Sequence, residues 1–99
     1  MIETAKQHNA LVLVDEAYNP FLEQSMLEYL SECYNLLIAR TFSKARGLAS
    51  ARLGYIVGSE EIISNLFKVR PLYETNAFAV CFGIYLLDHP EIMDDHLEQ

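Results

Sequence analysis

Two short apolar runs, each followed by polar residues, constrain the fold of this chain more than any other feature. Residues 11–14 (Leu-Val-Leu-Val) and 36–39 (Leu-Leu-Ile-Ala) contain no polar side chain. Unalternating runs of this kind are typical of strands covered on both faces, as in a parallel sheet. Between them, apolar residues recur at near-helical spacing from Leu22 to Cys33. The pattern predicts a βαβ unit with an amphipathic helix of about three turns and a right-handed crossover.

The other apolar segments add one strand and several helices. Residues 53–57 form a third apolar run. Ser59 then precedes two acidic residues, which predicts a helix start, and Pro71 ends that helix. Residues 76–88 predict a helix with almost no polar face, which needs a covering surface. The predicted class is α/β: part of a mostly parallel three-layer sheet, with about three strands and flanking helices.

Length and charge limit the possible partners. The chain has 99 residues, which allows one domain at most, and its net charge of −7 argues against nucleic acid and anionic membrane surfaces. No apolar segment is long enough to span a bilayer. Cys33 and Cys81 lack metal-binding spacing, so we expect no metal and two reduced, buried thiols in a cytoplasmic protein.

Basic and hydroxyl residues gather after the second apolar run, in a segment rich in small residues, and three of the basic residues, Arg40, Lys44 and Arg46, fall within seven positions. Thr41, Ser43, Lys44 and Arg52 can together form an oxyanion pocket, in which Arg52 grips a phosphate with its planar fork of donors. A lysine beside another cation loses its proton more easily, which favours nucleophilic chemistry. The alternative is that these are solvated loop charges, although the cluster in an acidic chain favours an anionic ligand.

Parallel strands bring this loop close to the residues that follow the first apolar run. Ligands of open α/β sheets bind at the carboxyl ends of the strands, where Asp15 and Tyr18 are also expected. A carboxylate, a phenol, a lysine and a phosphate clamp match the needs of pyridoxal phosphate. Its ring nitrogen must stay protonated for the cofactor to act as an electron sink, and a carboxylate favours that charged form.

These residues also carry a resemblance to a known family. The run Asp-Glu-Ala-Tyr at 15–18, followed by residues 41–49 and 52–55, resembles the fold-type I pyridoxal-phosphate aminotransferases, above all the histidinol-phosphate aminotransferase branch. The resemblance implies that Asp15 pairs with the ring nitrogen and Tyr18 binds the ring oxygen. It also implies that Lys44 binds the cofactor covalently and shuttles a proton. Thr41, Ser43 and Arg52 would bind the phosphate.

Simpler roles remain open for several of these residues. Asp15 can be a turn cap, Tyr18 a packing residue, and Thr41 a strand-end hydroxyl that serves its own backbone. Glu16 is expected to cap or pair rather than to catalyse. Arg46 is interpreted as a surface or interface charge.

The resemblance covers only part of a family member. We therefore expect residues 1–99 to be a single partial domain, the C-terminal half of the cofactor-binding large domain, with an exit helix at 76–88. Such a segment would belong to an enzyme that moves an amino group between an amino acid and a keto acid, and would be inactive alone. A homodimer, or assembly with the missing parts, is expected. The alternatives are a non-catalytic α/β fragment and a lyase or decarboxylase of the same fold.

Overall fold

The computed structural model describes residues 1–19, 24–44, 48–71 and 74–92. The chain divides into two compact units. The first contains residues 1–40 and 55–70, and the second contains residues 41–54 and 71–99. The first unit therefore holds the strands, and the second holds the loop after the second strand together with the apolar helix.

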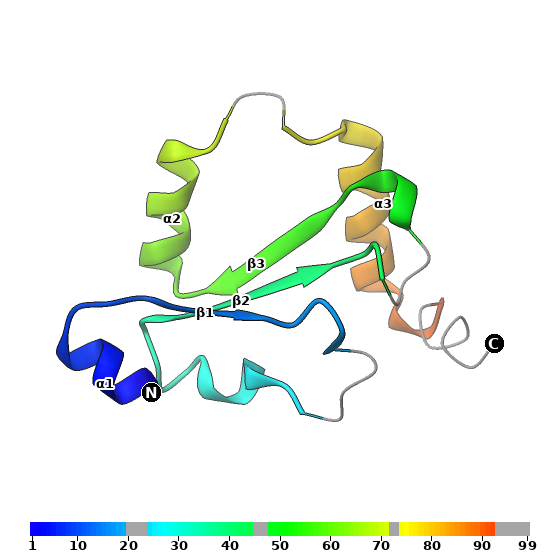
Figure 1. Cartoon of the computed structure of the whole chain (residues 1–99). Coiled ribbons are helices and arrows are strands. Elements are labelled where there is room, and N and C mark those ends of the chain that lie inside the picture. Colours follow the sequence, from blue (N-terminus) through cyan, green and yellow to red (C-terminus); the bar gives the residue numbers. More distant parts are fainter. Residues whose placement is uncertain (20–23, 45–47, 72–73, 93–99) are drawn as a thin grey trace. The chain divides into compact units, whose positions relative to one another are not determined.

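Within the described residues, three strands form one sheet, and their order in the sheet follows their order in the chain. They are β1 (Val12–Asp15), β2 (Leu36–Thr41) and β3 (Gly54–Gly58). β1 and β2 are parallel, with Asp15 opposite Ala39. β3 runs the other way (Figure 1), so the sheet is mixed. The predicted α/β class, with three strands and flanking helices, is confirmed.

Two α-helices belong to the described part of the first unit, and the second of them is the helix predicted after Ser59. α1 (Ile2–Gln7) precedes β1, and α2 (Glu60–Val69) follows β3. Ser59 is the N-cap residue of α2, but its Oγ donates to the carbonyl of Tyr34 at 3.3 Å instead of capping the helix. α2 ends before Arg70, which is extended (φ −68°, ψ 143°) because the next residue is Pro71.

The prediction of a three-turn helix before β2 is wrong. The described part of this segment contains the 3₁₀ helix η2 (Met26–Tyr29), followed by turns up to residue 35. Its short-range bonds include Leu30 N–H to the Leu27 carbonyl at 3.2 Å. Ser25 is extended (φ −129°, ψ 147°) and its Oγ accepts from Leu27 N–H, so a continuous helix cannot pass through this position. Leu22 lies outside the described residues.

The core of the first unit is the apolar start of β2. Leu36, Leu37 and Ile38 are buried, with exposed fractions of 0%, 5% and 0%. The prediction that β1 is covered on both faces does not hold within the described residues. The burial of β1 alternates, and Leu13 is 59% exposed. β1 therefore has a half-buried face, formed by Val12 and Val14, and an exposed face that carries Leu13 and Asp15.

The second unit packs the loop after β2 against α3 (Ala77–Asp88). Asn76 caps this helix, since its side chain accepts from Phe78 N–H at 2.8 Å. Gly83 is buried, and a Cβ there would lie 3.4 Å from Phe42 Cε2 and closer still to Leu53 Cδ2. This glycine lets the helix approach the two apolar residues closely. The helix predicted over 76–88 is confirmed.

Candidate functional site

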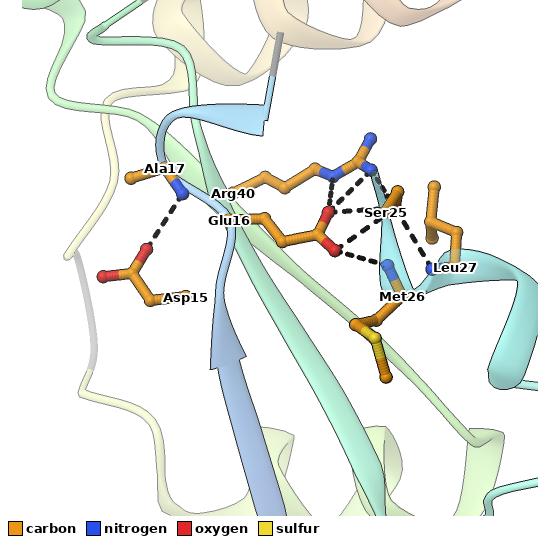
Figure 2. A network of polar contacts seen from close by, with 7 residues as sticks. All are labelled: Asp15, Glu16, Ala17, Ser25, Met26, Leu27 and Arg40. Atoms are coloured by element: carbon orange, nitrogen blue, oxygen red, sulfur yellow. Dashed lines mark hydrogen bonds and ion pairs between the residues drawn. The ribbon is translucent and has the colours of Figure 1, made fainter. Parts of the chain in front are cut away.

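Two adjacent carboxylates at the end of β1 have opposite environments. Asp15 is exposed, and its Oδ1 accepts from Ala17 N–H at 2.9 Å in a tight turn. Glu16 is only 7% exposed. Figure 2 shows the two side chains pointing to opposite sides of the strand end, as strand alternation requires. One carboxylate is therefore available at the surface, and the other is used inside the unit.

Four donor groups meet the carboxylate of Glu16. Arg40 contributes Nη2 at 2.8 Å and Nε at 3.1 Å, both to Oε2. Ser25 Oγ lies 3.0 Å from Oε2, and Met26 N–H donates to Oε1 at 2.6 Å. Arg40 Nη2 also donates to Ser25 Oγ at 2.8 Å, which closes the network (Figure 2). The expectation that Glu16 caps or pairs is confirmed, since it pairs with Arg40 and holds the first amide of η2.

The protonation of this pair follows from its contacts. Burial alone would raise the pKa of Glu16, but the hydrogen bonds from Met26, Arg40 and Ser25, with the charge of Arg40, lower it below 4.5. Burial alone would lower the pKa of Arg40, but Glu16 and Tyr55 raise it instead. Both groups are therefore charged at neutral pH, and Glu16 is not available as a general acid or base.

Tyr18 lies on the same turn as Asp15. The turn is closed by Asn19 N–H, which donates to the Glu16 carbonyl at 3.0 Å. The Tyr18 side chain is 56% exposed and makes an interaction within the structure. Asp15 and Tyr18 thus leave the carboxyl end of β1 together, in the place where the sequence predicts a ligand.

The four other predicted site residues are Thr41, the last residue of β2, and three residues of the loop that follows, and hydrogen bonds shape the start of that loop. Thr41 Oγ1 donates to the Leu53 carbonyl at 3.2 Å and accepts from Ser43 N–H at 3.1 Å. This is the backbone role left open for Thr41. Ser43 is half-buried, and Lys44 is exposed with an interaction of its own. Arg46 lies outside the described residues.

Arg52 has a strained backbone at the far end of this loop. It follows the 3₁₀ helix η3 (Ala49–Ala51) and is left-handed, with φ 51° and ψ 43°. This conformation costs a residue with a side chain about 1–2 kcal/mol, and such strain clusters at functional sites. The conformation therefore marks Arg52 as a position where a function can outweigh local stability.

The structure pairs one residue of the basic cluster with a buried acid. Arg40 belongs to the basic cluster of the sequence, but its guanidinium forms an ion pair with Glu16. The sequence analysis did not identify Ser25, whose Oγ accepts a hydrogen bond from Arg40. The strand register accounts for the pairing of Glu16 with Arg40. Asp15 lies opposite Ala39, so the residues that follow them, Glu16 and Arg40, are also neighbours. The prediction of two buried thiols is also wrong, since Cys33 is half-buried and Cys81 is exposed.

Two general features complete the description of these residues. Among the residues placed by the structure, no group of three or more His, Cys, Asp or Glu side chains could hold a metal ion. None of the helices in the described ranges is both long and apolar enough to cross a lipid bilayer.

Comparison with known proteins identifies the family. The family described as "Aminotransferase class I and II" matches residues 1–99, the whole chain. The chain belongs to this aminotransferase family. A histidinol-phosphate aminotransferase of Pyrococcus furiosus is 42% identical over 83 residues, which are 84% of this chain and 25% of that protein. Histidinol-phosphate aminotransferase 2 of Cupriavidus pinatubonensis is 41% identical over 90 residues, 91% of this chain and 24% of that protein.

The aminotransferase fold is also found in a solved structure. The crystal structure of the histidinol-phosphate aminotransferase from Clostridium acetobutylicum superimposes with a TM-score of 0.80 over 97% of this chain and 30% of that chain. The sequence identity is 22%, so this likeness concerns the fold. The chain spans about a quarter of the length of the curated aminotransferases that it matches.

Proposed function

We propose that this chain is the lysine-bearing segment of a pyridoxal-phosphate-dependent aminotransferase. The enzyme would move an amino group between an amino acid and a keto acid. The names of the relatives suggest histidinol phosphate as the amino compound. Family membership over the whole chain supports the proposal. One structural observation carries it: Glu16 is bound within a buried network, whereas Asp15 is exposed at the end of the strand.

The residues present fit the cofactor. Asp15 would pair with its ring nitrogen, and Tyr18 would bind its ring oxygen, because both leave β1 on one turn. Lys44 would hold the cofactor covalently and then move a proton, as a lysine amine can. The bound cofactor supplies an electron sink for charge that develops on the substrate.

Three residues, at the end of β2 and in the loop that follows, would hold the phosphate. Ser43 and Arg52 offer a hydroxyl and a guanidinium, which are common phosphate donors. The strained backbone of Arg52 supports its assignment. Thr41 remains a predicted ligand, but its hydroxyl would have to exchange its bond to the Leu53 carbonyl for one to the phosphate.

Covalent trapping tests the proposal. The chain would be mixed with pyridoxal phosphate, scanned for a band near the visible edge, reduced with borohydride and digested for mass spectrometry. We expect the label on Lys44, with the band and the label lost in Lys44→Ala. Lys68→Ala is the matched control, because Lys68 is an exposed lysine that contacts Asn65. Equal labelling of Lys44 and Lys68 would show unselective chemistry and contradict the proposal.

The apolar surface of α3 favours assembly, with or without catalysis. Only Gly83 and Leu86 are buried in this helix, whereas Phe78 is 87% exposed and Ile84 is 56% exposed. We infer that the helix is covered by a second copy or by other parts of an aminotransferase. Light scattering after gel filtration would test this, with Phe78→Ser and Ile84→Ser expected to reduce self-association. A monomeric parent chain would exclude self-assembly through α3.

A further inference from the structure

Strand register decides which of the two neighbouring carboxylates at the end of β1, Asp15 or Glu16, faces outwards. Side chains alternate along a strand, so a slip of one residue would turn Asp15 inwards and Glu16 outwards. The observed pairing places Asp15 opposite Ala39. It therefore places Glu16 beside Arg40, and the two side chains meet at 2.8 Å.

The network around Glu16 favours this register over the slipped one. The Glu16 carboxylate reaches donors on β2 and on the segment that contains Ser25 and Met26. An aspartate turned inwards would be one methylene shorter and could not keep all of these bonds. Leaving Arg40 without its partner would also strand a mostly buried charge, which is 13% exposed.

We propose that Glu16, Ser25 and Arg40 are positioning residues that fix the end of β1, so that Asp15 presents its carboxylate to the ligand. The proposal rests on the proposed function, in which Asp15 serves the ring nitrogen of the cofactor. The link is short. Glu16 N–H donates to the Ala39 carbonyl at 2.8 Å, and the next amide, Ala17 N–H, holds the Asp15 carboxylate at 2.9 Å. Loosening Glu16 therefore loosens the turn that orients Asp15.

A cofactor-free measurement tests the positioning role directly. Amide hydrogen exchange of Ala17 would be followed by NMR in the parent chain, in Glu16→Gln and in Glu61→Gln. Glu61 is an exposed acid in the first turn of α2, so its variant makes the same chemical change outside the network. We expect protection of Ala17 to fall about tenfold in Glu16→Gln, as the loss of one ordinary hydrogen bond predicts. Protection should be unchanged in Glu61→Gln.

A reference amide separates local from global effects. Ile63 N–H donates to the Ser59 carbonyl at 3.0 Å in α2 and should keep its protection in both variants. Equal protection of Ala17 in Glu16→Gln and the parent would overturn the proposal. If Glu16→Gln does not fold, Ser25→Ala removes one donor and should lower Ala17 protection in the same direction. An unchanged Ala17 in Ser25→Ala would then overturn the proposal.

Cofactor binding gives the second readout. The dissociation constant for pyridoxal phosphate, from absorbance titration, should rise about tenfold in Glu16→Gln and stay constant in Glu61→Gln. A parent chain that binds and a Glu16→Gln variant that binds equally well would refute the positioning role. A parent chain that does not bind counts against the proposed function alone, and the exchange of Ala17 still decides the positioning role.

Discussion

Removing the guanidinium of Arg40 should leave a buried charge without its partner. In Arg40→Met the side chain keeps much of its apolar stem, but Glu16 loses both bonds from Nε and Nη2. Breaking a buried ion pair in this way costs about 3–5 kcal/mol. The two side chains are 13% and 7% exposed, so solvent screens the change little.

The hydrogen-bond donors that remain around Glu16 determine how much unfolding free energy Arg40→Met should lose. Met26 N–H and Ser25 Oγ still bond Glu16, which places the loss of unfolding free energy near about 3 kcal/mol. A domain of this length has an unfolding free energy of about 5–15 kcal/mol. The variant should therefore fold, but the midpoint of its unfolding should lie at a clearly lower denaturant concentration than that of the parent.

The loss of stability in Arg40→Met should be larger at neutral pH than at acidic pH. The pKa of Glu16 is lowered below 4.5 in the folded parent, so the stability it contributes is complete above 4.5 and is lost as pH falls through the lowered pKa. Without Arg40, burial raises the pKa of Glu16 relative to the parent. The variant then regains stability on acidification as Glu16 becomes neutral. The difference between the two proteins should be largest at neutral pH and should shrink towards acid.

Urea unfolding followed by circular dichroism measures this difference. Parent and Arg40→Met would be compared at about pH 7 and about pH 4, with m-values checked for equality. Arg70→Met is the matched control, because Arg70 is exposed and contacts only the Phe67 ring among the interactions described for it, at 4.7 Å. A loss below about 1 kcal/mol at neutral pH, or a loss that does not change with pH, would refute the reasoning.

Three further outcomes are expected. Gly83→Val should destabilise the second unit by about 1–3 kcal/mol, because the valine side chain would enter the space of Leu53 and Phe42. In thermal melts, the double variant Gly83→Val with Leu53→Ala should regain part of the lost melting temperature. Arg52→Asn should keep or raise the melting temperature, since Asn tolerates φ 51°, while weakening cofactor capture in the absorbance titration; a lowered melting temperature would contradict the strain argument. The 99 residues alone should show no turnover with an amino acid and a keto acid in a coupled assay, and measurable turnover would contradict the partial-domain hypothesis.

The fold was predictable where apolar runs had clear ends. The three strands and the helices after Ser59 and Asn76 appear close to where their patterns place them. The segment before β2 was not predictable from periodicity. Its start is set by the Glu16 carboxylate, which binds Met26 N–H, and its end is set by the pairing of Asn35 with β1. Both constraints come from residues outside the segment.

The candidate site was predictable in its residue types, and less so in how the charges are shared. From the sequence, Arg40 belongs to the same local excess of basic residues as Lys44 and Arg52. In the structure Arg40 forms an ion pair with Glu16, because the parallel register of β1 and β2 makes the two residues neighbours. The orphan acceptor Asn35 Oδ1, buried without a hydrogen-bond partner among the described residues, had no sequence signal either.

The pairing of Glu16 with Arg40 also explains why adjacent acids at a strand end can have separate tasks. A carboxylate that is buried among fixed donors cannot adapt to a ligand, whereas an exposed one held by a single turn amide can. In a parallel pair of strands, an arginine one residue past the register partner of the first acid will select the second acid. In this chain that position holds Arg40, which pairs with Glu16 and leaves Asp15 exposed, and Arg40→Met measures how much the pairing contributes.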